Sequence, residues 1–221
     1  MRYVLWLRML VAVLLVCWSV APRLAVAAGD AASSQAPVAS VTRIQGAVRA
    51  SLDGAVRTLA MGDALRLGET VLTGPQARLE VVFPDGSALT LGEETEFVVD
   101  AYLYDPDAGR GGALFALATG AFRVVTGRMT AMRGASLEVR TPRASIGIRG
   151  TDFWGGYLSP DVLEVLLLSG DWLEVRNRVG VTILDEPGEG VSVPSPDQAP
   201  GPVMHWPEAK MRRAVDTVAF R

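Results

Sequence analysis

Apolar and polar residues alternate in short runs from about residue 40 to residue 193. In the run FVVDAYLY, the alternation puts four residues on one side: Phe97, Val99, Ala101 and Leu103. GAFRVVT (120–126) and ASIGI (144–148) show the same period of two, which predicts β-strands with one buried face. No run in this region keeps a helical period of 3.6 for ten residues. We therefore expect an all-β domain of many short strands over 40–193.

Glycine marks the turns between these runs. Asp53-Gly54 and Asp85-Gly86 each sit between alternating runs and predict β-hairpins, because glycine tolerates the positive φ of a tight turn. Gly46, Gly120 and Gly170 open similar segments, but their spacings are unequal, which argues against a solenoid of uniform rungs. The prediction is a twisted arrangement, either solenoid-like or a sandwich.

Residues 1–27 have the pattern of a secretory signal peptide. Arg2 and Arg8 precede the apolar stretch 9–20, and Ala25-Val26-Ala27 offers a small-x-small cleavage site. The apolar stretch is too short for a bilayer, which a helix crosses with about 20 residues. We expect a cleaved signal, a periplasmic or secreted protein and no stable membrane span; an uncleaved anchor is the alternative.

Signal removal changes the charge. The whole chain has 21 Lys and Arg against 24 Asp and Glu, a net charge of −3. Residues 1–27 carry three arginines and no acid, so 18 basic residues remain against 24 acidic ones, a net charge of −6. This balance argues against nucleic acid as a partner. The one cysteine, Cys17, is removed as well, which excludes disulfides and thiolate metal sites in the mature protein.

The regions that flank the β domain have other compositions. Residues 28–39 are small and polar and predict a flexible tether, and 194–206 form a proline-rich linker. Residues 207–221 predict a short helix with an apolar stripe that includes Met211 and Val218. We expect this helix to dock on the β domain; a helix that binds a partner or a membrane surface is the alternative.

The chain offers few groups for catalysis. His205 is the one histidine and lies in the linker, where a solvated or packed role is expected rather than that of a base in a triad. Asp100, Asp105 and Asp107 could bind calcium, although they lack the regular spacing of a calcium loop. Paired carboxylates, as in a glycosidase, stay an alternative, because the sequence alone does not place two acids across a cleft; a solvated acidic face is the expectation. We therefore predict a non-enzymatic protein with no catalytic, cofactor or metal site.

Charges gather in two adjacent blocks. Residues 79–109 hold eight acids and no base, and residues 121–150 hold six arginines against Glu138. We expect ion pairs between facing strands of the two blocks. The alternative is a patch of Arg123, Arg140 and Arg143 that binds a glycan or a carboxylate ligand.

The stretch TPRASIGIRGT, 141–151, resembles the signature of the FecR domain. Seven residues carry the motif: Thr141, Pro142, Ala144, Gly147, Arg149, Gly150 and Thr151. The segments 41–50, 61–91, 112–127 and 162–177 are similar in order to those of that family. The resemblance implies an extracytoplasmic all-β module, which in signalling members senses an outer-membrane receptor and controls a cytoplasmic sigma factor. Only eight residues precede Met9. We therefore expect this chain to have the FecR-like domain without the cytoplasmic segment that controls a sigma factor.

Arg149 lies between Gly147 and Gly150, which allow a tight turn. Our hypothesis is a buried clamp in which the guanidinium satisfies backbone carbonyls; an arginine that grips a ligand is the alternative. Together these features suggest a binding, scaffolding or sensing module of the bacterial envelope with a protein partner. A split signalling system and a carbohydrate-binding or carbohydrate-active protein are the rival hypotheses.

Overall fold

The computed structural model describes residues 36–221. The predicted signal peptide and residues 28–35 of the expected tether lie outside the described residues. Strand β1 (Pro37–Gln45) begins three residues before the expected start of the β domain. Among residues 36–221, no helix has the length and apolar character needed to span a membrane.

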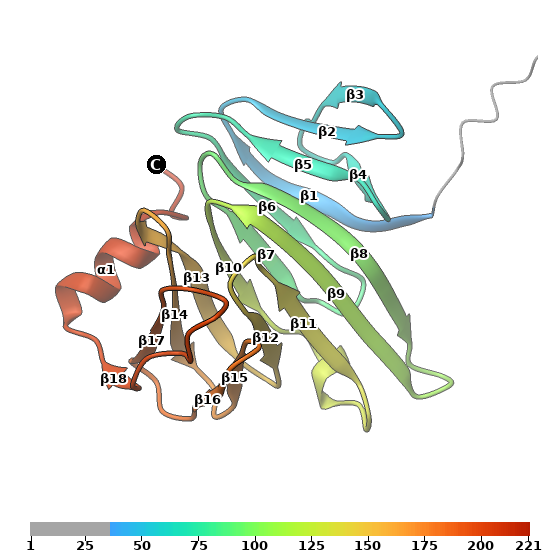
Figure 1. Ribbon diagram of the computed structural model, residues 1–221. Coiled ribbons are helices and arrows are strands. Elements are labelled where there is room, and N and C mark those ends of the chain that lie inside the picture. Colours follow the sequence, from blue (N-terminus) through green and yellow to red (C-terminus); the bar gives the residue numbers. More distant parts are fainter. Residues whose placement is uncertain (1–35) are drawn as a thin grey trace, which may run out of the picture. The chain divides into compact units, whose positions relative to one another are not determined.

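The strands form two nine-stranded sheets, here called sheet A and sheet B (Figure 1). In spatial order, sheet A contains β18 (Met204–His205), β17 (Glu189–Val193), β14 (Val162–Ser169), β13 (Asp152–Ser159), β10 (Ala121–Val125), β7 (Ala88–Leu91), β6 (Arg78–Val82), β1 and β4 (Ala64–Arg66). Sheet B contains β16 (Val181–Leu184), β15 (Leu173–Arg176), β12 (Ser145–Ile148), β11 (Ser136–Arg140), β9 (Arg110–Thr119), β8 (Glu96–Asp105), β5 (Thr70–Thr73), β2 (Val48–Leu52) and β3 (Ala55–Thr58).

The chain passes repeatedly between the two sheets as it advances along both of them. Among the strands of residues 36–221, neighbours pair antiparallel except β9 and β11, which are parallel. The two predicted hairpins are present: β2 pairs with β3 around Asp53-Gly54, and β6 pairs with β7 around Asp85-Gly86. Asp53 and Gly54 both have positive φ, which suits the right-handed twist of a tight hairpin.

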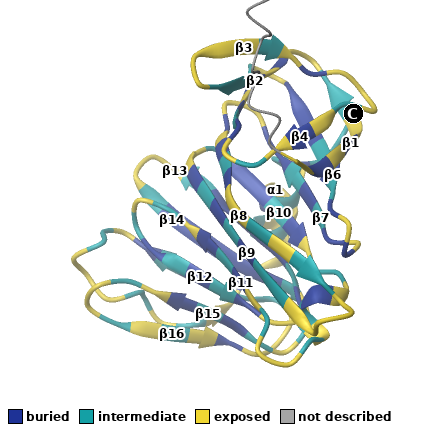
Figure 2. Cartoon of the chain, turned by 90° about the vertical axis from the view of Figure 1, so that its right-hand side faces the viewer, coloured by how far each residue is buried: buried dark blue, intermediate teal, exposed yellow. Residues whose placement is uncertain are grey.

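One hydrophobic core takes side chains from both sheets. Phe122 and Phe153 of sheet A pack edge to face at 5.6 Å, and Phe97 and Phe115 of sheet B lie 5.5 Å apart. All four belong to the same buried cluster, and buried positions alternate with less buried ones along the strands (Figure 2). The all-β prediction is confirmed as two large sheets around a shared core. The solenoid-like alternative is not confirmed.

A β-bulge corrects the predicted face of β8. Phe97 and Val99 are buried as expected, but the register with β9 shifts between Val99 and Ala101. One extra residue turns every later side chain to the opposite face. Leu103 is therefore exposed, and Tyr102 packs against the core instead, with its hydroxyl 3.0 Å from Asp85 Oδ1.

The C-terminal segment docks on the outer face of sheet A. Helix α1 (Glu208–Asp216) packs over β13 and β14 in Figure 1. A second buried cluster joins Trp154 of the sheet to Trp206 and Val218. The indole Nε1 of Trp154 donates to Thr217 Oγ1 at 2.9 Å. The short predicted helix is thus present, and it covers apolar surface of the sheet.

Candidate functional site

The first half of the motif closes the turn between β11 and β12. The backbone N–H of Thr141 and its hydroxyl both donate to the Ala144 carbonyl at 2.9 Å. Thr141 Oγ1 also accepts the backbone N–H groups of Arg143 and Ala144. Pro142 follows Thr141 in this four-residue turn, where its fixed φ suits the second position. The T-P-x-A part of the motif therefore has a structural role.

The second half of the motif brings two turns together. Gly150 has a φ of +64° and Gly170, before β15, a φ of +105°. A Cβ atom on Gly170 would lie 2.7 Å from the Gly150 carbonyl oxygen, so only glycine fits there. Thr151 is buried, and its carbonyl accepts the N–H of Thr126 at 3.1 Å and the Thr126 hydroxyl at 3.0 Å. The β12–β13 turn is thus held by Thr126 and by close backbone packing.

Arg149 is exposed, which contradicts the buried-clamp hypothesis. The preceding residue, Ile148, points into the core, so Arg149 is turned toward solvent. Within residues 36–221, its side chain makes no hydrogen bond, ion pair or ring contact. A nearby carbonyl that a clamp would need, that of Thr151, is already satisfied by Thr126. Arg149 is therefore available to a ligand.

A nearby arginine, Arg143, does bind a backbone carbonyl, although at an exposed position. Its guanidinium donates from Nη1 to the carbonyl of Pro194, just beyond β17, and from Nη2 to Asp161 Oδ1 at 3.3 Å. The Arg143 side chain is only 18% exposed, whereas that of Asp161 is 91% exposed. The bond to the carbonyl of the exposed Pro194 ties the β11–β12 turn to the end of β17.

The three arginines of the predicted patch do not come together. Arg123 forms a bidentate pair with Asp152 at 2.8 and 2.6 Å, and the hydrogen bonds to Asp152 raise the pKa of Arg123. Arg140 pairs with Glu138 at 2.9 Å. Because β10 lies in sheet A and β11 in sheet B, Arg123 and Arg140 project from different sheets, and Arg143 is occupied as described.

The expected pairing between the two charge blocks is also wrong. Among the ion pairs within residues 36–221, the arginines of 121–150 meet Glu138, Asp152 or Asp161 and none of the acids of 79–109. The reason is the topology. Strand β10 of the arginine block pairs with β7 of the acidic block, but β7 carries no acid, and Arg123 lies opposite Thr90.

Arg149 lines an open hollow of about 680 Å³. The hollow is bounded by the end of β10 and the following 3-10 helix η1 (Arg128–Ala131), the β12–β13 turn and the β14–β15 turn. Its lining residues are Thr126, Gly127, Thr130, Ala131, Arg149, Gly150, Asp171 and Trp172. Gly150 of the motif therefore lines a concave surface in addition to allowing the turn.

The hollow combines a cation, an anion and an aromatic ring. Arg149 and Asp171 are both exposed, and neither has a partner among residues 36–221. The Trp172 indole lies over Gly147, where an added Cβ would be 3.8 Å from the ring. A guanidinium can bind a carboxylate bidentately while an indole stacks on an apolar or sugar face. This arrangement is suited to binding a small polar group.

Sequence reasoning did not place Asp171 and Trp172 beside the motif. Both lie far from the motif in sequence, and only the contact between the two turns brings them beside Arg149. An aromatic residue directly after a Gly-Asp turn, in SGDWLEV, was the available signal. His205 is exposed, as the solvated role expected from the sequence requires, and it lies in β18 beside Glu186 and Glu189, outside this hollow.

Residues 69–171 match the family model described as FecR protein. Two crystal structures of a candidate anti-sigma factor from Parabacteroides distasonis are similar to this chain at 20% identity, with TM-scores of 0.47 and 0.48. Each covers 61% of this chain and 57% of the other, so the chain spans less than two thirds of their length. A structure described as a cell surface anchoring domain is 32% identical over 28% of this chain and 82% of its own, with a TM-score of 0.27. No curated protein matches the sequence.

Proposed function

This chain contains a FecR domain, and from that premise we propose that it is an exported, non-enzymatic binding and sensing module of the bacterial cell envelope. The matched residues, 69–171, include Arg149 and Asp171 of the hollow. Export is supported by the signal-peptide pattern of residues 1–27. The function then depends on what the hollow binds.

The observation that carries this proposal is the unpaired Arg149 beside Trp172. Arg123, Arg140 and Arg143 are each paired with an acid, and Arg143 also bonds a carbonyl, whereas Arg149 has no partner among the described residues. Arginine and tryptophan are enriched among the residues that dominate binding energy at protein interfaces. We propose that an acidic segment of an envelope protein places a carboxylate on Arg149.

The proposal of a binding role rather than catalysis is supported by the chemistry of the lining. Its hydroxyls are engaged with the backbone: Thr126 donates to Thr151 and Thr130 donates to the Gly127 carbonyl at 3.2 Å. Neither hydroxyl is hydrogen-bonded to a base that could activate it, which nucleophilic catalysis requires. Asp171 and Arg149 serve recognition in this view.

Site-specific cross-linking in the native host tests the proposal. A photoreactive amino acid in place of Ala131, which is exposed and lines the hollow, should capture a discrete envelope protein that mass spectrometry identifies. The matched control places the same residue at Met61, which is 72% exposed and does not line the hollow. Arg149→Ala should weaken the interaction at least about tenfold, which corresponds to about 1.4 kcal/mol. Arg178→Ala, on another exposed arginine, should leave it unchanged.

Equal capture from both positions, or capture that persists in Arg149→Ala, would refute the proposal that the hollow is the binding site.

A glycan is the second candidate ligand, favoured by the exposed Asp171 and the Trp172 ring. In that case retention on an acidic polysaccharide column should be lost in both Arg149→Ala and Trp172→Ala. A separate receptor or anti-sigma protein among the captured partners would identify a split signalling system.

A further inference from the structure

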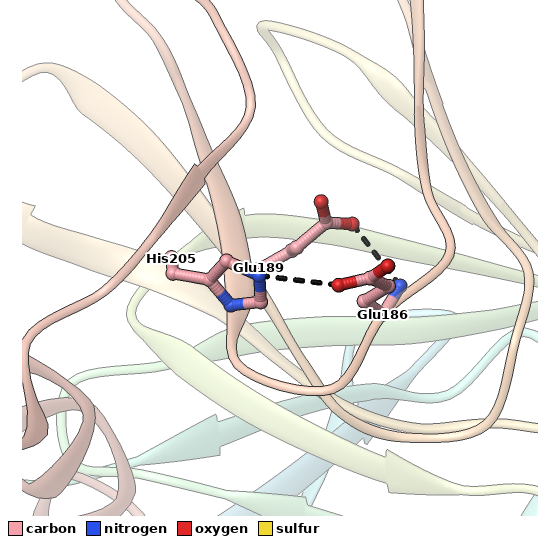
Figure 3. Close-up of side chains that lie close together, drawn as sticks. All are labelled: Glu186, Glu189 and His205. Atoms are coloured by element: carbon pink, nitrogen blue, oxygen red, sulfur yellow. Dashed lines mark hydrogen bonds and ion pairs between the residues drawn. The ribbon is translucent and has the colours of Figure 1, made fainter.

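A second group of candidate ligands lies where β18 pairs with β17. His205 is directly opposite Glu189 in this antiparallel pair, and Glu186 lies in the turn before β17 (Figure 3). One ligand atom from each of the three side chains lies within 4.8 Å of the others. Directly opposed residues in a sheet have their Cβ atoms about 4.5–5.5 Å apart, which suits side chains that share one ion.

The spacing of two of the ligand atoms fits a metal centre. His205 Nε2 lies 3.3 Å from Glu186 Oε2. In a tetrahedral zinc site the metal–ligand bonds are about 2.0–2.2 Å long, so neighbouring ligand atoms lie about 3.3–3.5 Å apart. The observed separation is long for a hydrogen bond to a carboxylate and falls within the range for two ligands of one ion.

The turn holds two of the three side chains in place. Glu189 Oε2 accepts the backbone N–H groups of Asp185 at 3.0 Å and Glu186 at 3.1 Å, which leaves its other oxygen for an ion. Gly188 has a φ of +92°, and a Cβ atom there would lie 3.4 Å from His205 Nδ1. The imidazole therefore lies against the turn with Nε2 toward Glu186, as Figure 3 shows. Support of this kind orients metal ligands in proteins.

The two carboxylates of the group, Glu186 and Glu189, favour a bound cation. Among residues 36–221, the one basic side chain within ion-pair distance of Glu186 is His205 itself, and Glu189 has no such neighbour. Both ends of the His205–Glu186 pair are open to solvent, at 61% and 69% exposed, so an ion can enter directly. Imidazole with carboxylates suits zinc, copper or nickel, whereas calcium and magnesium prefer oxygen ligands alone.

We propose that Glu186, Glu189 and His205 bind one divalent transition-metal ion, with water completing the coordination. None of these three residues lines the Arg149 hollow, so a test of the metal site does not depend on the proposed function. The ion would join the β16–β17 turn to β18, the strand that leads into helix α1. Metal binding should therefore strengthen the attachment of the C-terminal segment.

Zinc titration of the full chain, purified with a histidine-free tag, tests the site. Isothermal calorimetry should give one Zn²⁺ per chain, and His205→Gln should weaken binding at least about tenfold, because even the loss of a residue that only supports a ligand costs about 10–100-fold in affinity. Glu208→Gln is the matched control, because Glu208 is an exposed acid that pairs with Arg212 outside the group. An unchanged thermal transition of each variant without metal would show that the fold is intact.

A spectroscopic readout separates this site from loose binding to surface acids. His205 is the only histidine in the chain, so bound Cu²⁺ should show hyperfine coupling to a single imidazole nitrogen by electron paramagnetic resonance, lost in His205→Gln. The proposal is overturned by zinc binding that survives His205→Gln. It is equally overturned by absence of zinc binding at millimolar concentration, or by binding of Ca²⁺ in preference to Zn²⁺.

Discussion

Arg143→Ala is predicted to destabilise the protein more than Arg149→Ala. The Arg143 side chain is 18% exposed and donates to the Pro194 carbonyl, whereas its second partner, Asp161, is 91% exposed and adds little. A hydrogen bond from a charged group is worth about 1.5–3 kcal/mol, and water can partly replace it at the exposed Pro194 carbonyl, so its loss should cost about 1–2 kcal/mol. For a domain of this size, that corresponds to a fall in Tm of roughly 2–8 °C.

Arg149→Ala should change the free energy of unfolding by no more than about 0.5 kcal/mol, as for other exposed residues without partners. Urea unfolding and calorimetry of the two variants beside the parent chain measure both effects, and equal m-values would show that the unfolded states are comparable. A larger loss for Arg149→Ala than for Arg143→Ala would refute this reasoning. That result would support the hypothesis drawn from the sequence, in which the Arg149 guanidinium is buried and binds backbone carbonyls.

Three further changes test other contacts. Gly170→Ala should cost at least about 2 kcal/mol in urea unfolding, because it combines a φ of +105° with a contact of 2.7 Å to the Gly150 carbonyl. Lys210→Ala leaves the buried Glu164 carboxylate without the amine 2.6 Å away, so we expect a loss of about 1–3 kcal/mol and faster proteolysis of the C-terminal helix. Burial raises the pKa of Glu138, but hydrogen bonds from neighbouring side chains outweigh it and lower the pKa overall. Its stabilisation should be complete above about pH 4.3, the unfolded value, and disappear as pH falls through the folded pKa, so the Tm difference between parent and Glu138→Gln should shrink in acid.

The fold was predictable where the signal is local. Period-two runs and Asp-Gly turns placed the hairpin around Asp85 and the buried positions Phe122 and Val124, because strand alternation and positive φ are properties of a few neighbouring residues. The bulge after Val99 was not predictable in this way. It depends on how β8 pairs with β9, and it changes which of Tyr102 and Leu103 faces the core.

The role of Arg149 was mispredicted for a related reason. Its flanking glycines indicated a sharp corner, and Gly150 does have positive φ. Whether the arginine satisfies that corner depends on Thr126, which is distant in sequence and supplies both its N–H and its hydroxyl to the Thr151 carbonyl. Asp171 and Trp172 likewise reach the hollow through a contact between turns, which no local pattern encodes.

The C-terminal segment shows how composition alone can mislead. Residues 194–206 read as a linker because prolines are frequent, yet Trp206 at the end of that range is only 6% exposed. A Cβ atom on Gly190 would lie 2.3 Å from the Trp206 ring, so this glycine makes room for the indole rather than marking a turn. That packing fixes β18 against β17 and places His205 opposite Glu189. The position of the candidate metal group therefore depends on the buried tryptophan, and Gly190→Ala should disturb both.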